Sequence, residues 1–160
     1  MFDFVNKKNL GIIAWILIST VAVFLIVTNS YHSQKGVAWE GYGRTVISTD
    51  ANQYIDVVVS DTLERRTRGL SGTPSLESGL GMLFIFDQSG ANGFWMKDMK
   101  YAIDIFWLDD TYQLIHTQRN VSPDTYPESF GEEVISRYVL ETNVGELVDF
   151  TKIQIQNSPN

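Results

Sequence analysis

The stretch GMLFIFDQSGANGFWMKDMKYAIDIFWL, residues 81–108, decides the fold of this chain. It contains three short runs rich in aromatic and branched side chains, at 81–86, 93–97 and 102–108. Runs of this length and composition, bounded by turn-forming residues, are typical of β-strands. The connection DQSGAN at 87–92 is rich in such turn-forming residues. We therefore predict three consecutive strands joined by short connections.

The same pattern continues on both sides of this stretch. Residues 44–48 and 53–60 are rich in β-branched side chains and flank the turn cluster Asp50-Ala51-Asn52, which predicts a hairpin. Further strands are expected at 112–119, 136–141 and 151–156. Strands and helices do not alternate in a βαβ rhythm, so a parallel sheet is not expected. We predict a mainly β domain, a small antiparallel sandwich or partly closed barrel with one or two short helices.

One short helix is expected between the strand at 53–60 and the stretch described above. Asp61 has a side chain suited to an N-cap, and Glu64 follows it at the spacing of a capping box. The helix would run from Thr62 to about Gly69, and Gly72 and Pro74 would end it.

The N-terminal part of the chain has the composition of a membrane anchor. Leu10 to Val27 is a run of 18 residues without a charged side chain. As a helix it would be about 27 Å long, close to the ~30 Å hydrocarbon core of a bilayer. The run exceeds the roughly 7–15 apolar residues of a cleaved signal peptide, so we predict an uncleaved anchor. Lys7 and Lys8 precede it, which favours a cytoplasmic N-terminus.

These patterns divide the chain into four segments. We expect a cytoplasmic N-terminus at 1–9, a single transmembrane signal-anchor helix at 10–28, a linker at 29–43 and an outward-facing β domain at 44–157. The expected location is the cell membrane, which the chain crosses once through Leu10 to Val27. The C-terminal domain would then lie outside the cytoplasm.

Charge and cysteine content exclude several classes of function. The formal net charge of −7 argues against binding to nucleic acid, which requires clustered positive charge. The absence of cysteine excludes disulfides, thiolate metal sites and cysteine nucleophiles. The chain has two histidines and no H-x-H or H-E-x-x-H motif, so we expect neither a zinc site nor another cofactor.

Several short motifs lie in the predicted domain in a characteristic order. They are Arg65 with Gly69-Leu70, Gly81–Phe86, Phe94–Lys97, Ile103–Ile105, and Arg137–Glu141 with Gly145. With them, roughly residues 45–156 resemble the bacterial and archaeal family called domain of unknown function 192. The resemblance implies a mainly β fold with a small helix, often after a signal or anchor, and carries no activity over. The chain departs from the family pattern at two points, with Asp98-Met99 in place of Asn-Thr and Ala102-Ile103 in place of Pro-Leu.

Two acidic residues lie within predicted strands and are candidates for a functional role. Asp104 lies between two isoleucines, so strand alternation places it on the face opposite to both. A carboxylate among apolar neighbours needs a partner, and the expected ones are the arginines at 65–68 or Arg137. Glu141 ends a predicted strand and is expected to pair with an arginine of the 65–68 cluster. Such residues can form structural clamps, or a carboxylate pair that hydrolyses a glycosidic bond.

Trp95 precedes Lys97 at the end of a predicted strand. Such a ring commonly belongs to the core, but next to polar groups it can also bind a sugar or small molecule. The candidate ligand-binding residues are Arg68, Trp95, Lys97, Asp104 and Glu141. The main hypothesis is a membrane-anchored, envelope-facing binding or accessory domain. The alternatives are an envelope hydrolase acting on a polysaccharide through Asp104 and Glu141, and a structural subunit of a membrane complex.

Overall fold

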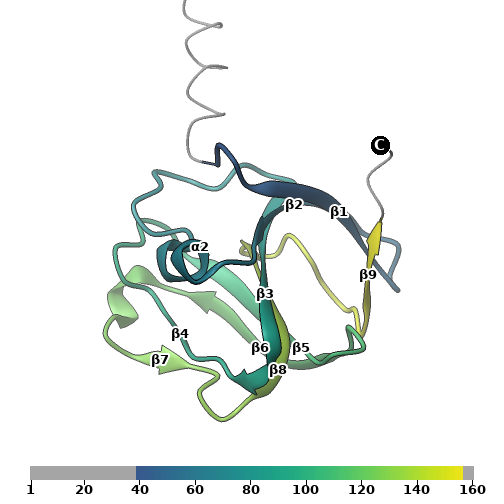
Figure 1. Cartoon of the computed structure of the whole chain (residues 1–160). Coiled ribbons are helices and arrows are strands. Elements are labelled where there is room, and N and C mark those ends of the chain that lie inside the picture. Colours follow the sequence, from purple (N-terminus) through teal and green to yellow (C-terminus); the bar gives the residue numbers. More distant parts are fainter. Residues whose placement is uncertain (1–38, 157–160) are drawn as a thin grey trace, which may run out of the picture. The chain divides into compact units, whose positions relative to one another are not determined.

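The computed structural model of the chain describes residues 39–156 (Figure 1). The predicted anchor at 10–28 and most of the predicted linker at 29–43 lie outside the described residues. Within residues 39–156, no helix is both long and apolar enough to span a bilayer. The compact unit that begins at Gly41 contains all the strands and is described below.

A seven-stranded sheet forms most of the domain (Figure 1). Its strands, in order across the sheet, are β6 (Leu114–Val121), β5 (Ile103–Leu108), β8 (Ile135–Asn143), β3 (Leu80–Ala91), β2 (Tyr54–Ser60), β1 (Gly43–Thr49) and β9 (Ile153–Gln156). A separate two-stranded sheet consists of β4 (Phe94–Trp95) and β7 (Ser129–Phe130). The helical elements are α2 (Leu63–Arg68) and the 3-10 helix η1 (Pro123–Thr125).

The mainly β class is confirmed, but the arrangement of the strands corrects the predicted antiparallel sandwich or barrel. The large sheet is mixed, because β2 and β3 run parallel while its other neighbouring strands run antiparallel. Parallel neighbours require a crossover connection, and residues 61–79 with α2 supply it. The two edges of the sheet meet at a single bridge between Gln113 and Lys152, which does not close the described strands into a barrel.

Helix α2 forms where it was predicted and begins one residue later. Its N-cap is Thr62, whose hydroxyl accepts a hydrogen bond from the backbone N–H of Arg65 at 3.3 Å. Asp61, the predicted cap, instead accepts from the Arg65 guanidinium at 2.6 Å. Gly69 ends the helix with a φ of 50°, in the left-handed region that glycine adopts without steric cost.

One face of the large sheet carries the main core. Leu83, Leu140 and Phe106 are fully buried and lie side by side on β3, β8 and β5 in one row of the register. The core also includes Ile47, Ile55, Val57, Leu108, Leu147, Phe150 and Ile153. The segment between β8 and β9 therefore helps to cover this face, where a sandwich would have placed a second sheet.

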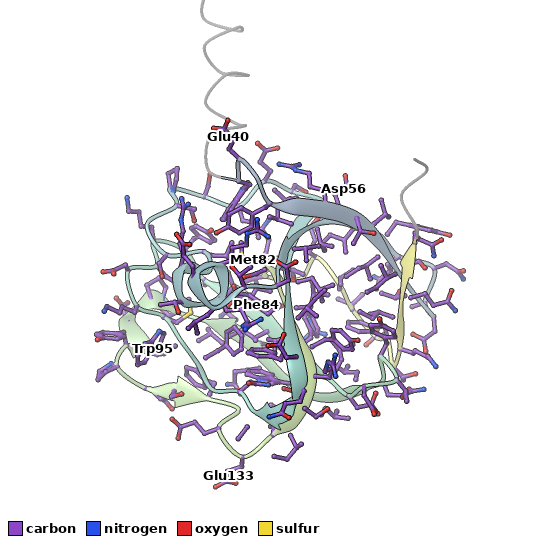
Figure 2. The ribbon with its side chains drawn as sticks, viewed as in Figure 1. Glu40, Asp56, Met82, Phe84, Trp95 and Glu133 are labelled. Atoms are coloured by element: carbon purple, nitrogen blue, oxygen red, sulfur yellow. The ribbon has the colours of Figure 1, made fainter. Side chains whose placement is uncertain are left out.

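The opposite face of the large sheet carries a second apolar layer. Met82 and Glu141 are register partners on β3 and β8, and strand alternation turns both away from the main core. Phe84 and Trp107 lie in the same layer, with the ring of Phe94 edge-on to them at centroid distances of 4.8 and 6.0 Å. Figure 2 shows Met82 and Phe84 in the interior next to α2. Glu141 is therefore a carboxyl group within an apolar layer.

Candidate functional site

Asp104 is buried on the main-core face of β5, and its side chain is 1% exposed. Its Oδ1 accepts a hydrogen bond from the backbone N–H of Asn120 at 2.7 Å. Its Oδ2 accepts from the backbone N–H of Gly145 and from the Arg119 guanidinium, both at 2.9 Å. The carboxylate therefore ties β5 to the edge strand β6 and to the turn that follows β8.

A bulge in β6 makes this arrangement possible. Ile103 pairs with Val121 and Ile105 pairs with Gln118, so two residues of β6 lie opposite Asp104 alone. The extra residue of a bulge leaves the strand ladder, which frees its backbone groups for other partners. Asn120 has a φ of 50° at this point and directs its N–H to the carboxylate.

Arg119 is the ion-pair partner of Asp104, which corrects the predicted pairing with the arginines at 65–68 or with Arg137. Its Nη1 also donates to the carbonyl of Leu147 at 2.6 Å, and its guanidinium lies 4.5 Å from the centroid of the Phe106 ring. Both contacts hold the guanidinium over the end of the main core.

The arginines of α2 have other partners. Arg65 bonds to Asp61 and donates to the carbonyl of Gly41 at 2.7 Å. Arg66 donates to the backbone carbonyls of Asp61 and Ile85 at 2.8 and 2.7 Å. The contact with Ile85 links α2 to β3. An arginine of α2 therefore connects the helix to the sheet as predicted, but its acceptor is a backbone carbonyl and not the expected carboxylate.

Glu141 has a different environment from Asp104. Its side chain is 5% exposed, and its Oε2 has no hydrogen-bond partner among the described residues. The predicted pairing with an arginine at 65–68 is therefore replaced by apolar cross-strand neighbours, Met82 and Ile105. Burial penalises the charged form and raises the pKa of Glu141 to about 8. The side chain is accordingly a neutral carboxylic acid at pH 7.

Asp104 and Glu141 lie on neighbouring strands but on opposite faces of the sheet. Ile105 pairs with Glu141, whereas Asp104 pairs with Thr142. Cross-strand partners point to the same face, and successive residues of a strand point to opposite faces. The structure therefore does not bring the two carboxyl groups together across one cleft, as hydrolysis of a glycosidic bond by a carboxylate pair would require.

Two loops place the C-terminal end of α2 next to the segment that follows β4. Residues 69–79 follow α2, and residues 96–102 connect β4 to β5. The hydroxyl of Ser71 donates to the carbonyl of Lys97 at 2.8 Å, and the backbone N–H of Ser71 donates to the carbonyl of Arg68 at 3.1 Å. Arg68 and Lys97, both exposed, thus lie on adjoining segments.

The ring of Trp95 lies at the surface beside these segments. Trp95 is 56% exposed, and its ring contacts that of Tyr126 edge-on at a centroid distance of 6.2 Å. Tyr126 is 46% exposed. Figure 2 places Trp95 at the rim of the domain, away from Met82 and Phe84. We call Trp95, Tyr126 and the neighbouring exposed Lys97 the Trp95 surface.

Comparison with protein-family models identifies the family. Residues 45–157 match the model of domain of unknown function 192 (DUF192), whose description is "Uncharacterized ACR". The chain belongs to the DUF192 family. The match covers the whole large sheet of the DUF192 domain apart from the first residues of β1. No curated protein matches the chain.

Two solved structures share the fold of this DUF192 domain. A protein from Sinorhizobium meliloti, described as a candidate transcription regulator, has a TM-score of 0.64 and 19% sequence identity. The comparison covers 71% of this chain and 95% of that one. A protein of unknown function from Novosphingobium aromaticivorans has a TM-score of 0.62 and 17% identity, over 71% of this chain and 84% of that one. At these identities the likeness concerns the fold alone.

The described part of the DUF192 domain offers no set of residues for a metal ion. Within residues 39–156, no three His, Cys, Asp or Glu side chains are grouped so that they could hold one. His116 instead packs against the ring of Trp107 at a centroid distance of 5.2 Å. Asp109 accepts hydrogen bonds from Thr111 and Gln113 within its own turn.

Three residues that shape the site of this DUF192 domain were not singled out from the sequence. Arg119 could have been found by aligning the predicted strands at 102–108 and 112–119 as a hairpin, but the bulge shifts their register. Tyr126 lies in a long loop, and Tyr101, whose hydroxyl is 2.7 Å from that of Thr73, lies in a connection between strands. Sequence patterns carry no information on which way such loop side chains point, because loops have no fixed periodicity.

Proposed function

We propose that this protein is a membrane-anchored, envelope-facing binding domain and that its Trp95 surface binds a saccharide. The observation that carries the proposal is that the Trp95 ring is exposed and contacts the partly exposed ring of Tyr126. The face of the exposed Trp95 ring offers a flat apolar area, and the ring of Tyr126, at 74° to it, borders this area. Sugar rings present a complementary apolar C–H face surrounded by hydroxyl groups.

The scaffold around Trp95 supports a preformed site. Trp95 lies on β4 and pairs with Ser129 of β7, so a sheet holds its backbone. The neighbouring loop at 96–102 is bonded to the loop at 69–79 through Ser71 and Lys97. A platform that is ordered before binding avoids the entropic cost of ordering loops around the ligand.

Cationic groups are available to hydrogen-bond with the ligand. Lys97 and Lys100 are exposed, and neither forms an ion pair within residues 39–156. A lysine ammonium group offers three donors to hydroxyl or carboxylate oxygens of a sugar. The proposal includes no catalysis, since Asp104 is saturated with hydrogen bonds and Glu141 lies on the other face.

Replacement of Trp95 by alanine is expected to weaken saccharide binding by about thirtyfold or more, the loss typical of an aromatic residue at the centre of a binding surface. The full chain, held in a detergent without a sugar headgroup, would be titrated calorimetrically with neutral and acidic oligosaccharides. Tyr54→Ala is the matched control, because Tyr54 is an exposed ring on β2, away from β4. Equal losses for both variants, or no binding by the unaltered chain across the panel, would show that the proposal is wrong.

The proposed anchoring rests on the 18-residue uncharged run and on Lys7 and Lys8. We expect the full chain to remain in the membrane fraction after carbonate washing. Protease added to intact spheroplasts should digest the β domain, because it would face outward. A protected domain would reverse the orientation. A mature chain beginning near residue 31 would indicate a cleaved signal peptide.

A further inference from the structure

The face of the sheet that carries Glu141 lies beneath the two loops at 69–79 and 96–102. Asn143 follows Glu141 by two residues on β8 and therefore shares its face. The side chain of Asn143 donates to the carbonyl of Leu76 at 3.3 Å and to that of Glu77 at 3.1 Å, which ties the first loop to this face.

The two loops are also bonded to each other. The hydroxyls of Thr73 and Tyr101 are 2.7 Å apart, and Thr73 is 4% exposed. The backbone N–H of Gly72 donates to the carbonyl of Asp98 at 3.0 Å. Together with the contact between Ser71 and Lys97, these bonds make the loops one cover over the apolar layer that contains Glu141.

We propose that Glu141 is a proton-controlled latch: in its neutral form it allows the cover formed by residues 69–79 and 96–102 to close on the sheet, and its ionisation releases this cover. The latch goes beyond the proposed saccharide binding and does not depend on it. It concerns a carboxyl group that the Trp95 surface does not use.

Within residues 39–156, the Oε2 of Glu141 has no hydrogen-bond partner, and Arg65 and Arg66 of α2 bond to other groups. From the neighbouring strands Glu141 faces Met82 of β3 and Ile105 of β5. In the loop at 69–79 the buried polar side chain is Thr73, which carries no charge. In the loop at 96–102 the titratable group that interacts with Glu141 is Tyr101. Burial above all, and in addition the charge of Glu141, raise the pKa of Tyr101. An ionised Glu141 would therefore remain without a cationic partner.

The direction of the effect follows from proton linkage. In the closed form, burial raises the pKa of Glu141 from its ordinary 4.5 to about 8. In an open form that admits water, the group would return to its ordinary value, so opening releases a proton. Between those two values each pH unit favours the open form by about tenfold. Above about pH 8 both forms are ionised, and the effect levels off.

Tryptic cleavage within the cover measures this release. Lys97 and Lys100 are exposed sites in the loop at 96–102. The full chain in detergent would be digested between pH 6 and 9, and its rate of cleavage would be divided by that of a short unstructured substrate at each pH. We expect the corrected rate to rise by up to tenfold per pH unit to about pH 8 and to level off above it, since cleavage follows the open population. In Glu141→Gln the rate should stay low at every pH.

Three controls make the outcome decisive. Glu133→Gln makes the same chemical change at an exposed residue, which Figure 2 shows at the far end of the domain, and should keep the pH profile of the unaltered chain. Glu141→Met, which cannot ionise, should abolish the profile even if the glutamine variant does not fold. Cleavage at Lys152, outside the cover, should not follow the profile. An unchanged profile in both Glu141 variants, or an equal rise at Lys152, would overturn the proposal.

Discussion

Replacement of Asp104 by asparagine is expected to lower the free energy of unfolding by about 3 kcal/mol, within the ~3–5 kcal/mol typical of breaking one side of a buried ion pair. The carboxylate accepts hydrogen bonds from Asn120, Arg119 and Gly145. In asparagine an NH2 group replaces one of the two carboxylate oxygens. This NH2 group is a donor and would face an N–H donor of Asn120, Gly145 or Arg119. Arg119 is 41% exposed and can recover some hydration, which keeps the loss at the lower end of this range.

Chemical denaturation of a fragment spanning residues 37–160 measures this loss. The fragment contains the compact unit that begins at Gly41. Asp110→Asn serves as the matched control, because Asp110 is exposed in a turn and its substitution should change stability by no more than ~0.5 kcal/mol. A change that small at Asp104 would contradict its role as a clamp between β5, β6 and the turn at Gly145.

Replacement of Gly131 by alanine is expected to lower the free energy of unfolding by about 3 kcal/mol, the sum of two separate costs. Gly131 has a φ of 75°, where a side chain costs ~1–2 kcal/mol. A Cβ at this position would also lie 2.3 Å from the ring of Trp107. This ring is fully buried, and its Nε1 donates to the carbonyl of Asn92 at 2.9 Å, so it cannot move aside freely.

A second glycine separates the two costs. Gly72 has a φ of 76°, and no atom lies within 4 Å of a Cβ built on it. Gly72→Ala therefore carries the backbone cost alone, and denaturation of the two variants should differ by the ~1–3 kcal/mol of overpacking. Equal losses would show that Trp107 and the residues around it accommodate a methyl group without strain.

Local sequence patterns were sufficient for most elements of this fold. They missed β7, which forms in a predicted loop, and β3 continues through the predicted connection at 87–92 as far as Ala91. The β-branched runs around Asp50-Ala51-Asn52 predicted the hairpin of β1 and β2, and both strands form there. The helix was predicted to run to about Gly69, with Gly72 and Pro74 ending it; it ends at Arg68, and Gly69 is its C-cap. These features depend on residues within one or two turns of each other, so their preferences act before any tertiary contact forms. The start of α2 moved by one residue because Asp61 bonds to Arg65 instead of capping the helix.

Pairings between segments far apart in the chain could not be predicted from local sequence patterns. The parallel pairing of β2 with β3 joins strands that are separated by a crossover connection. The alternation of side chains between the two faces of a strand does not depend on which strand it pairs with, so this alternation could not predict the pairing. The sheet order brings Glu141 between Met82 and Ile105, and its Oε2 has no hydrogen-bond partner among the described residues. Its neutral state at pH 7 is therefore a property of strand order.

The sequence by itself determined the family, most of the strands, the short helix and the acidic residue Asp104 within an apolar strand. Only the tertiary structure decided which residues meet. The bulge in β6 selects Arg119 as the partner of Asp104, and the alternation of β5 and β8 in register separates Asp104 from Glu141. The small sheet of β4 and β7 turns Trp95 outward toward Tyr126. Local preferences specify a segment's conformation, whereas register, bulges and loop packing depend on the summed burial of residues far apart in the chain.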